Sequence, residues 1–177
     1  MASDSLQWLS SLEFVRLVAL DVDGVLTDGR VVYAGAEEVQ HYHVHDGAAI
    51  VWLRRAGIQI AWITGRGAKA TETRAKELGV TELHQQSGPK ERVLASVQER
   101  LRILPEHTLS MGDDLIDLGL FARSAVRVAP ANARAEVRAR ADFVTLSSGG
   151  LGAVREMAER VLRARGAWDD LVASAGA

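Results

Sequence analysis

The sequence contains no cysteine, which excludes disulfides, thiolate zinc sites and cysteine nucleophiles. Proline occurs only three times, and aromatic residues make up 5% of the 177 residues. Lysine and arginine number 21 against 23 aspartates and glutamates, so the basic excess typical of nucleic-acid-binding proteins is missing. No apolar run approaches the roughly 18 residues that a membrane-spanning helix needs. We therefore expect a protein that binds neither nucleic acid nor membranes.

The N-terminal segment, residues 1–11, lacks the basic stretch and the apolar run of a signal peptide. Together with the missing thiols, this leads us to expect a cytoplasmic protein. Hydrophobic residues make up 47% and charged residues 25%, which is ordinary for a globular chain of this length. We predict one domain over residues 1–177, with a β-hairpin at about 30–43 and a C-terminal tail at about 165–177.

Segments that favour strands alternate with amphipathic segments that favour helices. Besides a buried strand within 14–20, the expected strands are 58–63, 80–84, 107–111, 125–128 and 142–144. The expected helices follow Asp46, cover 68–78, start within 87–90, and cover 115–121, 133–140 and 150–164. Asp46 and Asn132 are expected to cap their helices, and residues 173–177 to fray. The alternation predicts an α/β fold: a three-layer, doubly wound parallel sheet.

Two aspartates end the first strand, in the segment Asp21-Val-Asp-Gly-Val-Leu-Thr-Asp-Gly29. Burying carboxylates is costly unless they are paired or bind a cation. Ligands of parallel α/β sheets bind beyond the carboxyl ends of the strands, and residues i and i+2 point the same way. Asp21 and Asp23 can therefore share one pocket, although an acidic turn is an equally good interpretation of this stretch alone.

Three further polar sites follow later strands. Thr64 ends the strand 58–63, where it could bind a phosphate oxygen or cap the next helix. Lys90 lies in the first turn of a helix, where a cation opposes the helix dipole unless it faces an anion. Gly112 precedes Asp113, Asp114 and Asp117. Carboxylates gathered at a strand end suit Mg²⁺. The alternative, acids that favour the dipole at a helix start, explains Asp114 and Asp117 well and Asp113 less well.

Taken together, these residues fit a phosphoryl transferase. Asp21 is the candidate nucleophile that forms an aspartyl-phosphate. Asp23 is the candidate acid that protonates the leaving alcohol and the base that then activates water. A divalent cation would neutralise charge so that one anion can attack another.

The order Asp-x-Asp, Thr, Lys, Gly-Asp-Asp-x-x-Asp resembles the four motifs of the haloacid dehalogenase (HAD) superfamily, from Val15 to about Val161. The resemblance is strongest to the capless branch that holds the 3-deoxy-D-manno-octulosonate 8-phosphate (KDO 8-phosphate) phosphatases. It implies that the side chains of Asp21 and Asp113 and the backbone carbonyl of Asp23 bind Mg²⁺, with Asp114 and Asp117 behind them. The implied catalytic residues are Asp21, Asp23, Thr64 and Lys90. The implied substrate contacts are Asp23, His45, Asp46, Gly47, Ala48, Arg66, Arg74 and Lys90.

The same resemblance suggests how a capless enzyme covers its site. Only the hairpin separates the first motif from the next helix, so no cap domain is expected. In the resembled branch such hairpins assemble a homotetramer in which a neighbour covers each active site. The implied reaction is hydrolysis of KDO 8-phosphate, a step toward lipopolysaccharide.

Some alternatives stay open at this level. His45 stands where the resembled enzymes usually carry Arg or Lys, and Val51 where some carry Arg. Another sugar-acid phosphate, such as a nonulosonate 9-phosphate, is therefore a second candidate substrate. A phospho-acceptor or structural subunit without turnover is a third reading, which the paired Asp21 and Asp23 disfavour. His41, His43 and His45 alternate along the chain, so they could share a strand face and bind zinc. We do not expect this zinc site, because the aspartates already supply a metal site.

Overall fold

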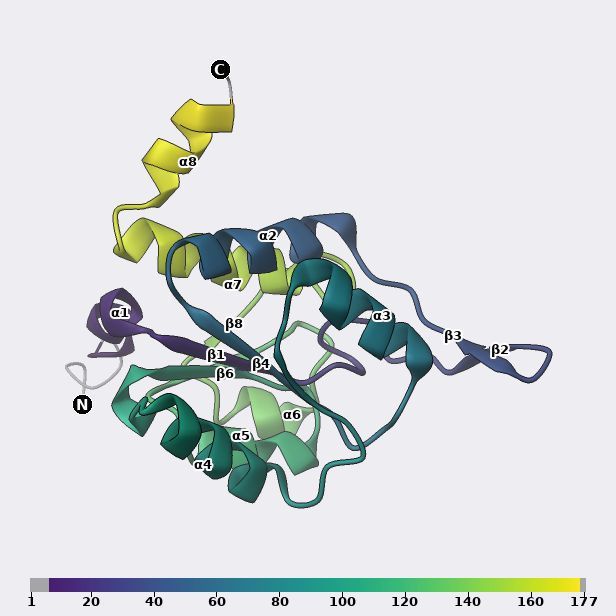
Figure 1. Ribbon diagram of the computed structural model, residues 1–177. Helices are drawn as coiled ribbons and strands as arrows, with labels where there is room; N and C mark the ends of the chain where they lie inside the picture. Colours follow the sequence, from purple (N-terminus) through teal and green to yellow (C-terminus); the bar gives the residue numbers. More distant parts are fainter. Residues whose placement is uncertain (1–6, 176–177) are drawn as a thin grey trace.

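A sheet of six parallel strands forms the centre of the computed structural model, which describes residues 7–175 (Figure 1). The strand order is β5-β4-β1-β6-β7-β8. The bounds are β1 Leu17–Leu20, β4 Gln59–Ile63, β5 Glu82–His84, β6 Thr108–Met111, β7 Val126–Ala129 and β8 Phe143–Val144. All neighbouring pairs are parallel, and Leu20 lies opposite Trp62 on one side and Met111 on the other. This confirms the predicted doubly wound α/β fold.

Strand β1 is buried on both faces because helices cover the sheet from both sides. Val18 and Leu20 belong to one hydrophobic cluster, whereas Leu17 and Ala19 belong to the cluster on the opposite face. The strand is shorter than predicted. Phe14 lies in a 3-10 turn, Leu12–Phe14, and is 55% exposed, because pairing with both neighbouring strands begins only at Leu17.

The helices form the two outer layers (Figure 1). Helices α2 Val44–Arg55, α3 Lys69–Leu78 and α7 Ala153–Ala164 lie on one face of the sheet, and α2 packs along α7. Helices α4 Lys90–Leu101, α5 Leu118–Phe121 and α6 Ala135–Arg138 lie on the other face. Short 3-10 turns at Pro105–His107 and Leu115–Asp117 precede β6 and α5. No helix in the described part of the chain is long and apolar enough to cross a membrane.

Asp46 has a different role from the one predicted. Helix α2 begins at Val44 with His43 in the N-cap position, so Asp46 does not cap its own helix. The buried Asp46 carboxylate instead accepts hydrogen bonds from the backbone N–H groups of Gly152 at 3.2 Å and Arg155 at 2.7 Å. It thereby caps α7, which starts later than expected and leaves Leu151 63% exposed.

Asn132 also differs from its predicted role. Helix α6 is a single turn with Arg134 in the N-cap position. The Asn132 side-chain amide donates to the carbonyl oxygen of Gly24 at 3.0 Å and accepts from the N–H of Gly149 at 2.6 Å. Asn132 therefore joins the loop after β1 to the loop before α7.

The hairpin projects from one end of the molecule (Figure 1). Its strands, β2 Val32–Ala34 and β3 Glu37–Val39, are shorter than predicted, since residues 40–43 pair with no strand. His43 precedes α2 and His45 lies within it, so the expectation that His41, His43 and His45 share a strand face is wrong.

At the opposite end, α1 Gln7–Ser11 and α8 Trp168–Ala175 extend the described chain. The predicted fraying of residues 173–175 is wrong because α8 continues to Ala175, and residues 176–177 lie outside the described range. Trp168 anchors the start of α8 by contacting Trp52 edge-on, with the ring centroids 6.0 Å apart.

The substitution Asp46→Ala should lower the free energy of unfolding by about 1–3 kcal/mol, because two backbone N–H groups at the start of α7 lose their acceptor. Urea denaturation followed by circular dichroism measures the effect. The matched control is Glu91→Ala, which removes an exposed acid from the first turn of α4. Equal destabilisation by the two substitutions would contradict the capping role of Asp46.

Candidate active site

The candidate catalytic residues meet at one edge of the sheet because each follows the carboxyl end of a strand. Asp21 follows β1, Thr64 follows β4 and Asp113 follows β6, while Lys90 opens α4 after β5. Strand β1 lies between β4 and β6, so the chain reverses its winding direction beside Asp21. Ligands of doubly wound sheets bind at such a switch point.

A buried lysine bridges two carboxylates at this edge. Lys90 Nζ donates to Asp21 Oδ1 at 2.5 Å and to Asp117 Oδ1 at 2.6 Å. Burial lowers the pKa of Lys90, but the charges of Asp21 and Asp117 outweigh this and raise it above its usual range. Lys90 therefore stays a cation although it is only 4% exposed.

Opposing electrostatic effects act on the carboxyl group of Asp21. Burial of its carboxyl group raises its pKa well above the usual range, and the neighbouring charge of Asp117 raises it further. Lys90 acts in the opposite direction and favours the carboxylate. The ionised form that a nucleophile requires thus depends on the neighbouring cation.

Asp21, Asp113 and Asp117 form a cluster in which one carboxylate oxygen from each residue lies within 4.8 Å of the other two. Burial, followed by the charges of Asp117 and Asp114, raises the pKa of Asp113 to about 6. Asp113 Oδ1 is buried and has no hydrogen-bond partner among the described residues. Carboxylates that repel one another and leave a free oxygen fit a hard divalent cation such as Mg²⁺. Within the described residues, no other group of His, Cys, Asp or Glu side chains has this geometry.

Asp117 and Asp114 hold the backbone behind the cluster. Asp117 Oδ2 accepts from the N–H groups of Asp113 at 2.9 Å and Asp114 at 3.1 Å. The exposed Asp114 accepts from the N–H of Leu115 at 2.7 Å and completes a reciprocal cap with Asp117. Asp117 is also a member of the cluster itself, and the supporting role expected for Asp114 and Asp117 stays a prediction.

Close backbone packing fixes the loop after β1. Gly24 has a φ of +95°, and a β-carbon there would lie 2.2 Å from Asp113 Oδ2. A β-carbon at Gly149 would lie 1.8 Å from the carbonyl oxygen of Gly24. Asn132 and Gly149 support the nucleophile loop from the C-terminal third of the chain. Sequence reasoning missed this role, since it assigned Asn132 to the cap of the neighbouring helix and gave Gly149 no part in the site.

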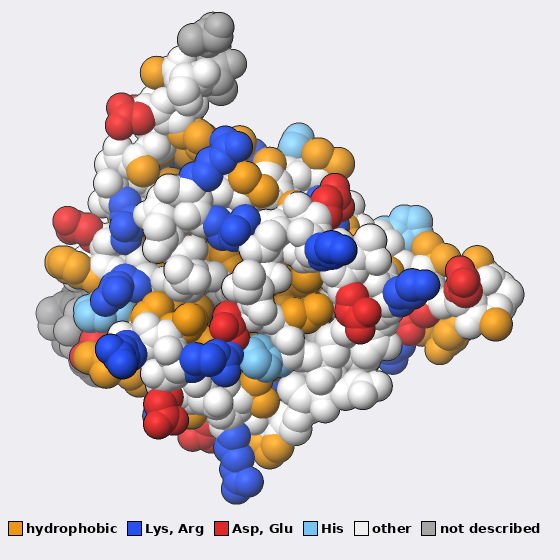
Figure 2. Space-filling view, viewed as in Figure 1, with side chains coloured by type: hydrophobic (Ala, Val, Ile, Leu, Met, Phe, Trp, Pro, Cys, Tyr) orange, Lys and Arg blue, Asp and Glu red, His pale blue; other side chains and the backbone are white. Residues whose placement is uncertain are grey.

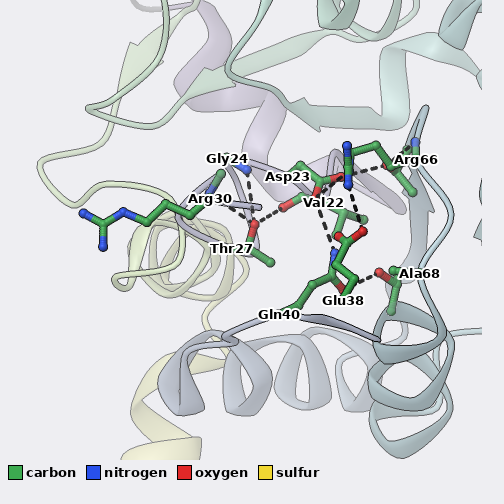
Figure 3. Close-up of polar contacts among 12 residues, drawn as sticks. Val22, Asp23, Gly24, Thr27, Arg30, Glu38, Gln40, Arg66 and Ala68 are labelled. Carbon is green, nitrogen blue, oxygen red and sulfur yellow. Dashed lines mark hydrogen bonds and ion pairs between the residues drawn. The ribbon is translucent and has the colours of Figure 1, made fainter. Parts of the chain in front are cut away.

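Three side chains from separate segments surround the carboxylate of Asp23, and Figure 3 shows two of them, Gln40 and Arg66. Thr64 Oγ1 donates to Asp23 Oδ2 at 3.1 Å, and Gln40 Nε2 donates to Oδ1 at 3.4 Å. Arg66 Nε lies 3.9 Å from Oδ1, and Arg66 Nη2 pairs with Glu38 of β3 at 2.8 Å. Ala68, not Thr64, occupies the N-cap position of α3, so the alternative role of Thr64 as a helix cap is wrong.

The remaining predicted substrate contacts cluster at the start of α2. His45 is exposed and its ring contacts His43 edge-on at 5.0 Å. Arg74 lies against Gly47, where a β-carbon would approach Arg74 Nη2 to 2.2 Å. Ala48 follows on the same helix, while the carboxylate of Asp46 is turned toward α7. Of the two arginines predicted to contact the substrate, Arg66 is the one that pairs with Asp23. The substrate contacts themselves stay predictions.

Comparison with known proteins extends these observations. The sequence model of the haloacid dehalogenase-like hydrolases matches residues 79–156. The 3-deoxy-D-manno-octulosonate 8-phosphate phosphatase of Escherichia coli (strain K12) is 41% identical over 164 residues, covering 92% of this chain and 87% of that protein. The Moraxella catarrhalis phosphatase of the same name, crystallised with magnesium, phosphate and KDO, superposes with a TM-score of 0.92 at 34% identity. That match covers 96% of this chain and 98% of the other.

A cobalt-bound relative from Haemophilus influenzae, a deoxy-D-mannose-octulosonate 8-phosphate phosphatase, superposes with a TM-score of 0.87 at 35% identity, covering 89% of this chain and 93% of the other. The fold and the aspartate–lysine site define a phosphoric monoester hydrolase of the HAD type. Within that class, the chain belongs to the KDO 8-phosphate phosphatase family.

Mg²⁺ should raise the unfolding temperature by about 5–10 °C at one hundred times its dissociation constant, because only the folded chain assembles the carboxylates. In Asp113→Asn most of this shift should disappear. Differential scanning fluorimetry with Mg²⁺ or EDTA measures both. Asp169→Asn, an exposed site in α8, is the control and should keep the full shift.

In EDTA, Asp113→Asn should unfold at a higher temperature than the wild type above about pH 6. The raised pKa means that the folded wild type binds the Asp113 proton more tightly than the unfolded chain does, so it loses stability as the pH rises from about 4 to 6. The advantage of the variant should shrink again toward pH 4. A difference between the two proteins that does not change with pH would contradict the crowding of carboxylates at this site.

Proposed function

We propose that this protein hydrolyses KDO 8-phosphate to KDO and inorganic phosphate through an aspartyl-phosphate intermediate. The observation that carries the proposal is the buried Asp21 carboxylate, which Lys90 contacts at 2.5 Å within a cluster of acids at the sheet edge. Membership of the KDO 8-phosphate phosphatase family supports the substrate. The Moraxella catarrhalis relative was crystallised with KDO and phosphate, the two products of this reaction.

In the first half-reaction an oxygen of Asp21 attacks the phosphorus atom and the bond from phosphorus to the sugar oxygen breaks. The Asp23 carboxyl group gives its proton to the departing oxygen, which leaves as the alcohol. Asp21 now carries the phosphoryl group as an acyl phosphate. Thr64 and Arg66, which contact Asp23, are suited to hold its carboxyl group during this step.

In the second half-reaction water attacks the phosphorus atom of the aspartyl-phosphate. Asp23, now a carboxylate, takes the proton from that water, and the bond between phosphorus and the Asp21 oxygen breaks. Inorganic phosphate leaves, and both aspartates return to their starting states. Lys90 offsets negative charge beside Asp21 in both steps.

The residues that would hold Mg²⁺ are Asp21 and Asp113 through their side chains and Asp23 through its backbone carbonyl. When bound, the ion would neutralise charge on the phosphate and on the carboxylate that attacks it. Asp117 would support this arrangement by fixing the backbone of Asp113 and by holding Lys90.

We further propose that the protein forms a homotetramer in which hairpins help to complete the active sites. Three apolar side chains of the hairpin segment are exposed: Val31 at 46%, Val32 at 40% and Tyr33 at 66%. Figure 2 shows hydrophobic side chains gathered on the projecting hairpin. A lone two-stranded ribbon is marginally stable in water, so contact with another subunit would stabilise it. A cytoplasmic location stays a prediction from the sequence.

Asp21→Asn should lower kcat for KDO 8-phosphate by at least about a thousandfold, because the amide is similar in shape but cannot act as the nucleophile. A phosphate-release assay with Mg²⁺ measures the loss, and circular dichroism checks the fold. Retained turnover in this variant would remove Asp21 as the nucleophile.

The wild-type assay also separates the alternatives. Higher kcat/KM with a nonulosonate 9-phosphate than with KDO 8-phosphate would transfer the proposal to the nine-carbon substrate. Release of one equivalent of alcohol per protein without further turnover would favour a phospho-acceptor.

The double substitution Val31→Lys and Val32→Lys should dissociate the oligomer and reduce activity together, because it places charge on the exposed apolar hairpin. Analytical ultracentrifugation and the phosphate assay measure the two effects. The control is Leu104→Lys, which alters an apolar side chain that is 55% exposed and lies before β6, at the amino end of that strand. It should change neither the oligomeric state nor the activity. A fully active monomeric double variant would contradict the shared site.

A further inference from the structure

A second layer of polar residues lies behind Asp23. Gln40 comes from the segment between the hairpin and α2, and its amide reaches the Asp23 carboxylate. Tyr42, two residues later, donates its hydroxyl to Gln40 Oε1 at 2.8 Å. Thr71 on α3 donates to the same oxygen at 2.7 Å. The Tyr42 and Thr71 hydroxyl oxygens lie 3.1 Å apart, which closes a triangle of polar groups.

The Asp23 carboxylate and this triangle together fix the orientation of the Gln40 amide. Its NH₂ group donates to the carboxylate, and its oxygen accepts from the two hydroxyl groups on the other side. The reverse orientation would place the amide oxygen against the carboxylate and the NH₂ group against the two hydroxyls. The carboxylate only accepts hydrogen bonds, so it selects the NH₂ end of Gln40, and the two hydroxyl groups then donate to the amide oxygen and stabilise this orientation.

The environment keeps the supporting hydroxyls in place. Thr71 is 1% exposed, and the Tyr42 ring stacks on the buried ring of Trp62 with the centroids 6.2 Å apart. Burial, followed by the nearby charge of Asp23, raises the pKa of Tyr42 to about 12, so its hydroxyl stays protonated. Figure 3 shows that Gln40 and Arg66 approach Asp23 together, while Glu38 holds Arg66 from the hairpin.

We propose that Gln40, held by Tyr42 and Thr71, is a positioning residue that orients the Asp23 carboxyl group for proton transfer to the leaving alcohol and from water. The inference rests on the proposed function, because it assigns Gln40 a role only through Asp23. Thr64 holds one oxygen of that carboxyl group and Gln40 the other, so rotation of the Asp23 side chain is restricted on both sides. The donors come from separate segments, and a loss of either leaves the other in place.

The test compares substrates that differ in their need for an acid. The alcohol of KDO 8-phosphate must be protonated as it leaves, whereas p-nitrophenolate is a stable anion that leaves without a proton. In Gln40→Leu, kcat for KDO 8-phosphate should fall about tenfold, the effect of one hydrogen bond to a charged group. KM should stay within about twofold, because Gln40 is assigned no contact with the substrate.

The single-turnover release of p-nitrophenolate, measured by stopped flow with enzyme in excess, should stay within about twofold of the wild type in Gln40→Leu. Steady-state turnover of p-nitrophenyl phosphate should fall about as much as with KDO 8-phosphate wherever attack of water limits it, because Asp23 is needed there as the base. Equal loss in the single-turnover phase would assign Gln40 a merely structural role and overturn the proposal.

Helix α3 offers a matched pair of variants. Thr71→Val removes a hydroxyl that holds Gln40, and Thr73→Val removes an exposed hydroxyl that donates to the carbonyl of Lys69 on the same helix. Thr71→Val should lower kcat for KDO 8-phosphate about threefold, as expected for weakening the support of one hydrogen bond, and Thr73→Val should leave it unchanged. Equal effects of the two, or wild-type kcat in Gln40→Leu, would overturn the proposal.

Asp23→Asn and the wild type together separate failure of this inference from failure of the proposed function. Wild-type hydrolysis of KDO 8-phosphate by Asp23→Asn would remove Asp23 as the acid and Gln40 as its positioning residue, while the phosphatase activity itself would stand. Absence of KDO 8-phosphate hydrolysis by the wild-type protein would overturn the proposed function. Loss of activity in Asp23→Asn with wild-type behaviour of Gln40→Leu would remove only the role of Gln40.

Discussion

The bridge from Lys90 to Asp21 and Asp117 is the interaction on which the site depends. A carboxylate buried at a sheet edge is unstable without a compensating charge, and the lysine supplies that charge at hydrogen-bond distance. Its position in turn depends on the fold, because Lys90 is the first residue of α4, which connects β5 to β6 and packs against β1 and β4. The buried lysine also explains why a cation lies at a helix start, where the dipole alone disfavours it.

Much of the fold and the main chemistry could be predicted from the sequence. Parallel strands buried on both faces leave apolar runs, and polar residues at their ends stand out against them, so Asp21, Thr64 and Asp113 were identifiable. The alternation of strand and helix patterns was enough to give the doubly wound topology. Local sequence patterns are enough to predict a structural feature when neighbouring residues or a regular spacing determine that feature.

The wrong predictions for Asp46 and Asn132 share a cause in long-range contacts. Asp46 and Asn132 were assigned to the helices beside them, but their partners are about a hundred residues away in sequence, at Arg155 and Gly24. A capping residue is recognised in the sequence by its residue type, but the residue type does not indicate which backbone groups its side chain will hydrogen-bond. The triangle of Gln40, Tyr42 and Thr71 is equally invisible in sequence, because two of its members lie in a segment without regular structure.

The support of the loop after β1 by Asn132 and Gly149 bears on the synthesis of the protein. Asn132 and Gly149, which fix the backbone around Gly24, are synthesised more than a hundred residues after it. A nascent chain that stops before them has its nucleophile but lacks part of the scaffold that holds it. Phosphatase competence therefore requires synthesis to pass Asn132 and Gly149, because these residues fix the backbone beside the nucleophile.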